Sequence, residues 1–234
     1  MKILNLRSMV WACGLAAAAC GALALMFLVP ASDLERTSPS ELVRLGNDCL
    51  KQDNPEKAVD YYTQALALDA QYAEGHNNLG NALAQLGRVD EARGHYEEAI
   101  RLAPRFFDAY SNRATMRMKE GDLKGAEEDY RMALQIRPDY AEAHYNLGLA
   151  LAAGDKYEQA ALHYASALEY GARTPQLYNN LGVALYKQDR LGEAADEFRR
   201  ALDLNPRYDT AQANLNAVLG FQEETQLYHG AMNE

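Results

Sequence analysis

Asparagines recur at one fixed interval along this chain, and their side chains could bind a polypeptide backbone. They stand 34 positions apart, at Asn78, Asn112, Asn146, Asn180 and Asn214. Asparagine is a mediocre helix former, so its repetition at one position needs a physical reason. A carboxamide offers donors and an acceptor, and can therefore bond the backbone of an extended peptide whatever its sequence. The alternative is that each asparagine bonds a neighbouring helix and has only a structural role.

A second row at the same interval is acidic. It consists of Glu74, Asp108 and Glu142. Three carboxylates in a row favour a ligand with basic residues or a free amine. Acids also suit the first turn of a helix because the macrodipole is positive there, so an ordinary solvated helix start explains the row equally well.

The same interval of 34 residues also indicates the helices that position these side chains. Small residues repeat at Ala58, Ala92, Ala126, Ala160 and Ala194, and aromatic residues repeat at Tyr62, Tyr96, Tyr130, Tyr164 and Phe198. Small residues let two helices approach closely, and aromatic rings fill the space between them. Pro104, Pro138 and Pro206 each follow a helix-like run and stop it. Each unit therefore predicts a helix, a short turn, a second helix and a stop.

This pattern resembles the tetratricopeptide repeat, which has the same small and aromatic positions and a closing proline. The resemblance implies an all-α, right-handed superhelix of five units, with the asparagine row in its concave groove. In glycosyltransferases with long arrays of this type, a similar asparagine ladder binds substrate chains. The fold serves many unrelated assemblies, so it does not by itself define a function.

The chaperone adaptors of the family bind a C-terminal carboxylate with asparagines and cations, and this clamp is only partly matched here. Its asparagine positions are matched by Asn47 with Asn78 in one register, or by Asn81 with Asn112 in the next. The cationic positions are lost in either register, and an acid replaces one of them. A carboxylate clamp is therefore disfavoured.

The sequence gives no support for an enzyme, a metal site or a cofactor. His76 and His144 occupy one position two units apart, and helix spacings of 8–10 Å would separate them by roughly 20 Å. His95 and His163 are also two units apart. We found no phosphate-binding glycine loop, cysteine cluster or nucleophile elbow.

The amino terminus predicts a membrane segment. Residues 9–29 are uncharged and mostly apolar, and at about 1.5 Å per residue they are long enough to cross a hydrocarbon core. Lys2 and Arg7 precede this segment, so the positive-inside rule places the amino terminus in the cytoplasm and the repeats on the periplasmic, extracytoplasmic side. Cleavage near Ala31, giving a periplasmic or secreted protein, and lipid modification at Cys20 are the alternatives.

The expected organisation follows from these segments. It is a basic segment 1–8, the apolar segment 9–29, a linker 30–38, five units at 39–72, 73–106, 107–140, 141–174 and 175–208, a capping helix 209–221 and a frayed tail 222–234. The net charge of −10 argues against a nucleic-acid partner, whose phosphates require basic residues. We therefore expect a non-enzymatic scaffold that binds an extended peptide or a partner's helix in the groove, within an envelope assembly. The alternative is an assembly protein that self-associates or braces a pilus, secretion or cytochrome-maturation machine through its convex face.

Overall fold

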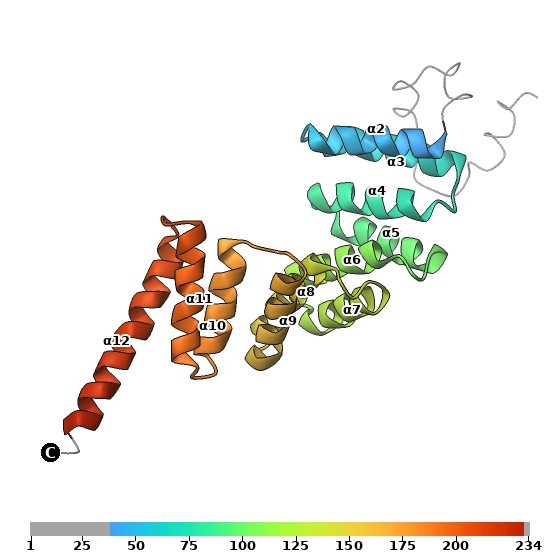
Figure 1. Ribbon diagram of the computed structural model, residues 1–234. Coiled ribbons are helices and arrows are strands. Elements are labelled where there is room, and N and C mark those ends of the chain that lie inside the picture. Colours follow the sequence, from blue (N-terminus) through green and yellow to red (C-terminus); the bar gives the residue numbers. More distant parts are fainter. Residues whose placement is uncertain (1–37, 232–234) are drawn as a thin grey trace, which may run out of the picture.

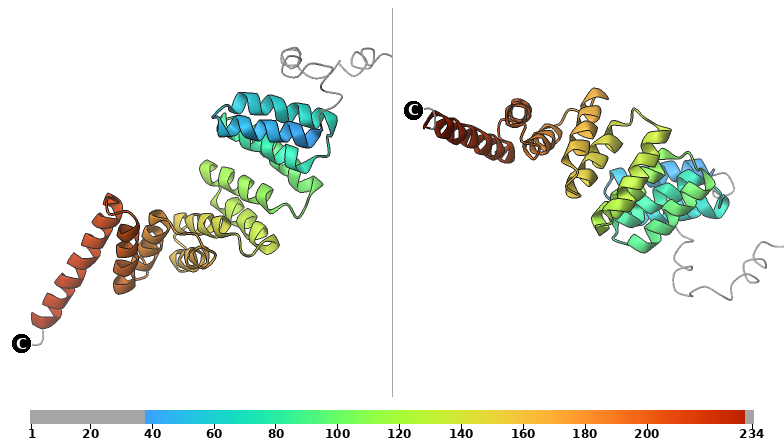
Figure 2. Two further views of the ribbon diagram at one scale, coloured as in Figure 1. Left: turned by 45° about the horizontal axis from the view of Figure 1, so that its top comes forward. Right: turned by 90° about the horizontal axis from the view of Figure 1, so that it is seen from below.

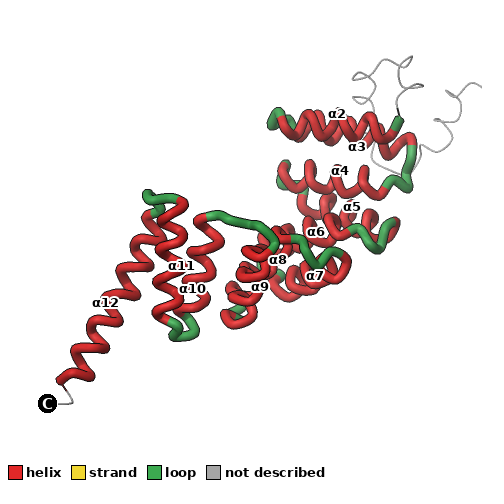
Figure 3. The backbone as a smooth tube through the Cα atoms, in the orientation of Figure 1, coloured by secondary structure: helices red, strands yellow, loops and turns green. Residues whose placement is uncertain are grey.

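The protein is a stack of paired antiparallel helices (Figure 1). The computed structural model describes residues 38–231, and side chains as far as Gly220. The helices in this range are α2 (Pro39–Lys51), α3 (Pro55–Leu68), α4 (Ala73–Gln85), α5 (Val89–Leu102), α6 (Phe107–Glu120), α7 (Leu123–Ile136), α8 (Ala141–Ala153), α9 (Tyr157–Glu169), α10 (Pro175–Tyr186), α11 (Leu191–Leu204) and α12 (Asp209–Ala231). Short turns join them (Figure 3). The all-α solenoid expected from the sequence is confirmed.

The predictions for the amino terminus fall outside this range. The basic segment 1–8, the apolar segment 9–29 and nearly all of the linker lie outside the described residues. Among the residues that are described, no helix has the length and apolar character needed to cross a membrane.

Helix ends are set by caps and by the repeated prolines. The side chains of Ser38, Asn54, Asp122 and Thr174 each accept a hydrogen bond from a backbone N–H in the first turn of the helix that follows. Helices α5, α7 and α11 each end two residues before a proline. Ala70 and Ala172 replace the proline in units one and four. Helix α3 still ends two residues before Ala70, and α9 ends one residue earlier in its unit, before Gly171, which has a φ of 95°.

The core of each unit is an aromatic ring from its second helix, set against its first helix. The five repeated aromatic side chains are at most 2% exposed. In four units the ring covers a glycine of the first helix, and a Cβ added to Gly148 would lie 2.5 Å from Cε1 of Tyr164. The glycines are therefore required by the close approach of the ring. Unit three has Ala114 at this position, also fully buried.

The stack curves because its two sides are packed differently. Each first helix contacts the first helix of the next unit, from α2 with α4 to α10 with α12. Within the described residues, consecutive second helices make no such contacts. A stack with one closely packed side bends toward that side, so the first helices form its inner face and the second helices its outer face. Figure 2 shows the helix direction turning along the elongated array.

One feature differs from the sequence-based expectations. The carboxyl-terminal helix does not end near Phe221, since α12 continues to Ala231. Residues 222–228 contain no glycine or proline and are mostly strong helix formers, which accounts for the continuation. In unit three, Arg113 stands where the other units have leucine, and its side chain is only 15% exposed and is paired with a buried carboxylate, Asp129.

Candidate peptide-binding surface

The asparagine ladder lies on the inner face, where most of its members bond the preceding unit. Nδ2 of Asn112 donates to Oδ1 of Asn77 at 2.9 Å, and Nδ2 of Asn214 donates to Oδ1 of Asn179 at 2.9 Å. Nδ2 of Asn180 donates to the Tyr145 hydroxyl at 3.2 Å. Each of these bonds joins two consecutive first helices. These asparagines therefore have a structural role, which was one of the two alternatives from the sequence, and the amide nitrogen of each carboxamide makes the bond.

The remaining two members of the ladder are held differently. Asn78 donates to Asn47 over 3.4 Å and accepts from Nδ2 of Asn77 at 3.2 Å. Asn146 makes no inter-unit side-chain bond within the described part of the chain, and the residue 35 positions before it is the shorter Ser111. All five ladder side chains are partly exposed. Asn146 therefore offers a carboxamide that is not used to join units.

Asn47 and Asn81 hold the aromatic rings of their own units. The hydroxyl of Tyr62 donates to Oδ1 of Asn47 at 2.6 Å, and the hydroxyl of Tyr96 donates to Oδ1 of Asn81 at 2.8 Å. Thr115 takes the same position in unit three and is bonded to the Tyr130 hydroxyl at 2.9 Å. Both asparagines thus have an intramolecular role, which the sequence spacing did not indicate.

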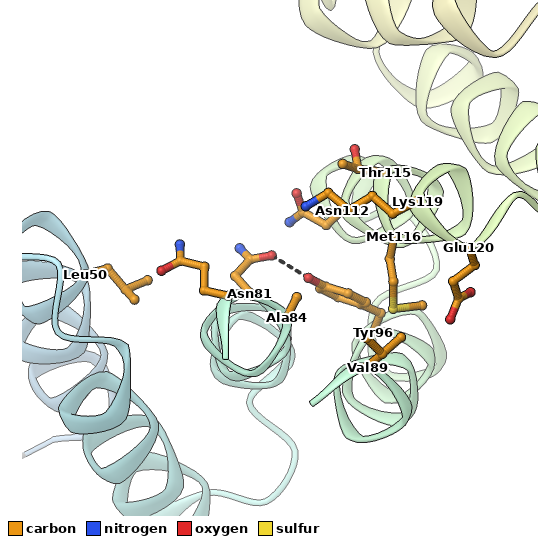
Figure 4. Close-up of a pocket in the computed structure, with 11 residues that line it drawn as sticks. Leu50, Asn81, Ala84, Val89, Tyr96, Asn112, Thr115, Met116, Lys119 and Glu120 are labelled. Carbon is orange, nitrogen blue, oxygen red and sulfur yellow. Dashed lines mark hydrogen bonds between the residues drawn. The ribbon is translucent and has the colours of Figure 1, made fainter. Parts of the chain in front are cut away.

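A pocket of about 390 Å³ opens on the inner face between units two and three (Figure 4). Its apolar lining comes from Leu50, Ala84, Val89 and Met116, which belong to four different helices. Its polar lining is given by Asn81, Gln85, Tyr96, Asn112, Thr115, Lys119 and Glu120. A mostly apolar hollow beside a member of the ladder is suited to hold one side chain of a bound polypeptide.

The acidic row lies at the beginnings of α4, α6 and α8. Tyr72 donates its hydroxyl to Glu74 at 2.9 Å, and Tyr140 donates its hydroxyl to Glu142 at 3.2 Å. Burial is the main cause that raises the pKa of Asp108; the nearby Arg137 lowers it, and the charges of Glu142 and Glu74 raise it further. The three carboxylates therefore influence one another across units, and a cation beside Asp108 would relieve their repulsion.

The structure also pairs histidines of the two helices within a unit. His76 and His95 of unit two face each other with their Nδ1 atoms 3.0 Å apart, and His144 and His163 of unit four do the same at 3.0 Å. The signal was present in the sequence, since both pairs have a separation of 19 residues. A comparison of equivalent positions in different units does not reveal this pairing within a unit.

Unit three has a buried ion cluster around Asp129. The other units have histidine, tyrosine or glutamate at the position of Asp129. Asp129, with a side chain only 4% exposed, accepts two hydrogen bonds from Arg113 at 2.7 and 2.8 Å. Arg117 pairs with the same carboxylate at 2.9 Å. Both arginines lie on α6, and both are paired with Asp129. The cluster therefore stabilises unit three, and the two arginines do not add a free positive charge to the inner face.

Together, the fold and this surface define an α-solenoid scaffold that presents a polar inner face. A family model described as "Tetratricopeptide repeat" matches residues 43–105 and 145–209, and a second, described as "TPR repeat", matches residues 114–154. The chain therefore belongs to the tetratricopeptide repeat family, which is typically non-enzymatic and acts through protein or peptide partners. A search of curated proteins gives no match.

Several solved structures have a similar fold. YrrB, a TPR protein with an unusual peptide-binding site, superposes with a TM-score of 0.64 at 21% identity, covering 78% of this chain and 95% of YrrB. PilF of Pseudomonas aeruginosa superposes with a TM-score of 0.69 at 20% identity, covering 81% of this chain and 83% of PilF. MamA of Desulfovibrio magneticus RS-1 superposes with a TM-score of 0.64 at 23% identity, covering 73% of this chain and 97% of the MamA chain. At these identities the likeness shows the fold alone.

Proposed function

We propose that this protein is a non-enzymatic scaffold that binds an extended peptide or a partner's helix along the inner face, within an envelope assembly. The observation that carries the proposal is the ladder. The amide nitrogens of Asn112, Asn180 and Asn214 bond the preceding first helix, which fixes these carboxamides and leaves their oxygens as oriented acceptors on the inner face. Preorganised acceptors reduce the entropy lost on binding.

Two further features give the ligand its chemistry. The pocket between units two and three accepts an apolar side chain, with Leu50 and Met116 in its lining. The acidic row favours basic residues or an amine near the beginnings of the first helices, because Asp108 is partly buried beside two other carboxylates. The proposed ligand is therefore a basic polypeptide with at least one large apolar residue.

Photo-crosslinking in the native host tests where the partner binds. A photoreactive amino acid replaces Gln85, which lines the pocket, or Leu162, which is 70% exposed on the outer helix α9. We expect a partner to be captured from position 85 of the full chain and not from position 162. Capture from position 162 alone would contradict groove binding.

The role of the ladder is tested with matched asparagine variants. Asn146→Ala removes a carboxamide that joins no units, so we expect weaker capture at position 85 with an unchanged melting temperature. Asn47→Ala removes the acceptor of the Tyr62 hydroxyl and serves as the control, with lower stability expected. A triple variant of Asn112, Asn146 and Asn180 to alanine should abolish capture. Unchanged capture in the triple variant would exclude the ladder as a binding device.

The second candidate function is assembly through the outer face. Apolar side chains are exposed on the second helices, with Leu68 44%, Leu162 70% and Leu204 50% exposed. Such side chains could support self-association or contact with a larger envelope machine. Replacing these three leucines by glutamine separates the two functions, because it should disrupt assembly while leaving capture at position 85 intact.

We also propose that residues 9–29 tether the array to a membrane with the repeats on the extracytoplasmic side. The support is the length and the lack of charge of that segment, with basic residues before it. Carbonate extraction of host membranes tests this, since a retained anchor keeps the full chain in the membrane fraction. Release of a shortened chain would indicate cleavage near Ala31.

A further inference from the structure

Each of the two histidine pairs brings two imidazole nitrogens close together, and the proposed scaffold function does not use them. In unit two, the imidazole of His76 is held from both sides, with Nε2 3.2 Å from the carbonyl oxygen of Ala70 and Nδ1 3.0 Å from Nδ1 of His95. In unit four, His144 is held in the same way by the carbonyl of Pro138 at 3.0 Å and by His163 at 3.0 Å. All four rings are partly exposed.

The carbonyl contact determines which nitrogen carries the hydrogen. A carbonyl oxygen can only accept, so Nε2 of His76 must donate and Nδ1 of the neutral ring must carry a lone pair. That lone pair is directed at His95. A histidine that donates one ring N–H to a backbone carbonyl and offers its other nitrogen has the arrangement found around metal-binding histidines.

We propose that the His76–His95 pair of unit two binds a divalent transition-metal ion, such as Zn²⁺, through the two Nδ1 atoms. With metal–nitrogen distances of about 2.0–2.1 Å, a tetrahedral site requires the two nitrogens to be about 3.3 Å apart. The rings must rotate slightly from the observed 3.0 Å. His95 moves its ring hydrogen from Nδ1 to Nε2 through solvent, so no net proton is released. Water completes the coordination, since no three His, Cys, Asp or Glu side chains gather at one point in the described residues.

Two carboxylates lie near the unit-two pair. Glu91 precedes His95 by four residues and Glu98 follows it by three, so both carboxylates lie on the same side of α5 as the ring. Both are paired with an arginine, Glu91 with Arg88 and Glu98 with Arg101. Burial is the main cause that lowers the pKa of His95, so the ring is neutral near pH 7 and free to bind a metal.

The unit-four pair is a natural comparison because its surroundings lack those carboxylates. The positions equivalent to Glu91 and Glu98 are Gln159 and Ser166. Arg131 of α7 lies beside His163 in a shared pocket of about 360 Å³, and its charge helps to lower the pKa of His163. Arg88 acts on His95 in the same way, but two carboxylates, Glu91 and Glu98, oppose it, whereas the carboxylate that opposes Arg131 at His163 is Glu127. Zn²⁺ should therefore prefer unit two.

Long-range ¹H–¹⁵N spectra of the imidazoles test the proposal on the full chain, titrated with Zn²⁺ alone. The chain has only five histidines, so each ring can be followed separately. We expect the Nδ1 resonances of His76 and His95 to shift first and to saturate at one ion per chain. Equal shifts in both pairs, or no shift at His76, would overturn the proposal.

Variants give a second readout. His95→Gln should weaken Zn²⁺ binding at His76 at least about ten-fold, while the matched variant His163→Gln should leave it unchanged. Glu98→Gln should weaken binding by a smaller factor without altering the imidazole pair. Circular dichroism confirms folding of each variant. If His95→Gln does not fold, the Glu98→Gln titration and the wild-type spectra still decide between the outcomes.

Discussion

At the scale of single residues, the contact between a glycine and an aromatic ring sets how closely the two helices of a unit approach. Gly80, Gly148 and Gly182 each lie under the ring of Tyr96, Tyr164 or Phe198, with space for no further atom. The rings are fully buried and enclosed, so they cannot rotate away cheaply. A single methyl group therefore meets resistance from the packed core of the whole unit.

Gly148→Ala should lower the free energy of unfolding by about 1–3 kcal/mol, because its Cβ would lie 2.5 Å from the Tyr164 ring. Thermal or urea unfolding measures the change. Gly94→Ala is the matched control, since nothing lies within 4 Å of its added Cβ and alanine favours a helix by about 0.5–1 kcal/mol. A neutral Gly148→Ala would mean that unit four can relax as unit three does around Ala114.

The partly buried His163 of unit four predicts a dependence of stability on pH. Burial first, then the charges of His144 and Arg131, lower the pKa of His163 to about 4, with Glu127 opposing them. The unfolded chain, with a histidine pKa of about 6.5, therefore binds more protons between pH 6.5 and 4. The stability that neutral His163 contributes is present above about pH 6.5 and is lost as the pH falls toward 4.

The effect is isolated by comparing the wild type with His163→Gln across that pH range. The wild type should lose on the order of 2 kcal/mol more than the variant between pH 7 and 4, since the variant has no ring to protonate. Urea unfolding at each pH gives the values. Parallel curves for the two proteins would show that the ring accepts a proton in the folded state without cost.

The sequence located the ladder, the acidic row and the aromatic core correctly as positions on helices, but it could not identify their partners. Asn81 shares a helix with Asn78, yet it bonds Tyr96, a residue 15 positions away on the next helix. Such a bond depends on how far the two helices are offset along their axes. Periodicity fixes which residues share a face and leaves that offset undetermined.

At the scale of the helix-turn-helix unit, the turn between the two helices has one residue in the left-handed region in every unit. These residues are again 34 positions apart, and they are Asp53, Gly87, Gly121, Asp155 and Asp189. Glycine adopts positive φ without strain, whereas aspartate does so at a cost. The sequence did not reveal this repeat, because two residue types share the position.

Asp189→Gly should therefore raise the free energy of unfolding by about 0.5–1 kcal/mol, because it removes strain at a φ of 61°. The gain is smaller than the strain removed, since glycine also increases the entropy of the unfolded chain. The converse change, Gly121→Ala, at a φ of 81°, should lower the melting temperature. A destabilised Asp189→Gly would mean that the carboxylate has a role in the turn that outweighs its strain.

At the scale of the whole molecule, the buried side chains divide into two main clusters. One joins units one and two and includes Leu42, Tyr62 and Leu83. The other joins units three to five with α12 and includes Tyr130, Leu151 and Leu185. They meet at the junction of α4, α5 and α6, where Met116 belongs to the first cluster and lines the inner-face pocket. A ligand in that pocket would contact both parts of the array.

This division predicts that the array does not unfold as one cooperative block, since each unit of a solenoid is stabilised only by its neighbours. Gly46→Ala should force its Cβ into the Tyr62 ring and weaken the first cluster, whereas Gly182→Ala should weaken the second through Phe198. Native-state hydrogen exchange measures the local stability of the two clusters separately. For a loss of 1–2 kcal/mol, exchange should accelerate about five- to thirty-fold in α2–α5 for the first variant and in α10–α11 for the second. Equal acceleration in all helices of either variant would show that the array unfolds as a single cooperative unit in spite of the two clusters.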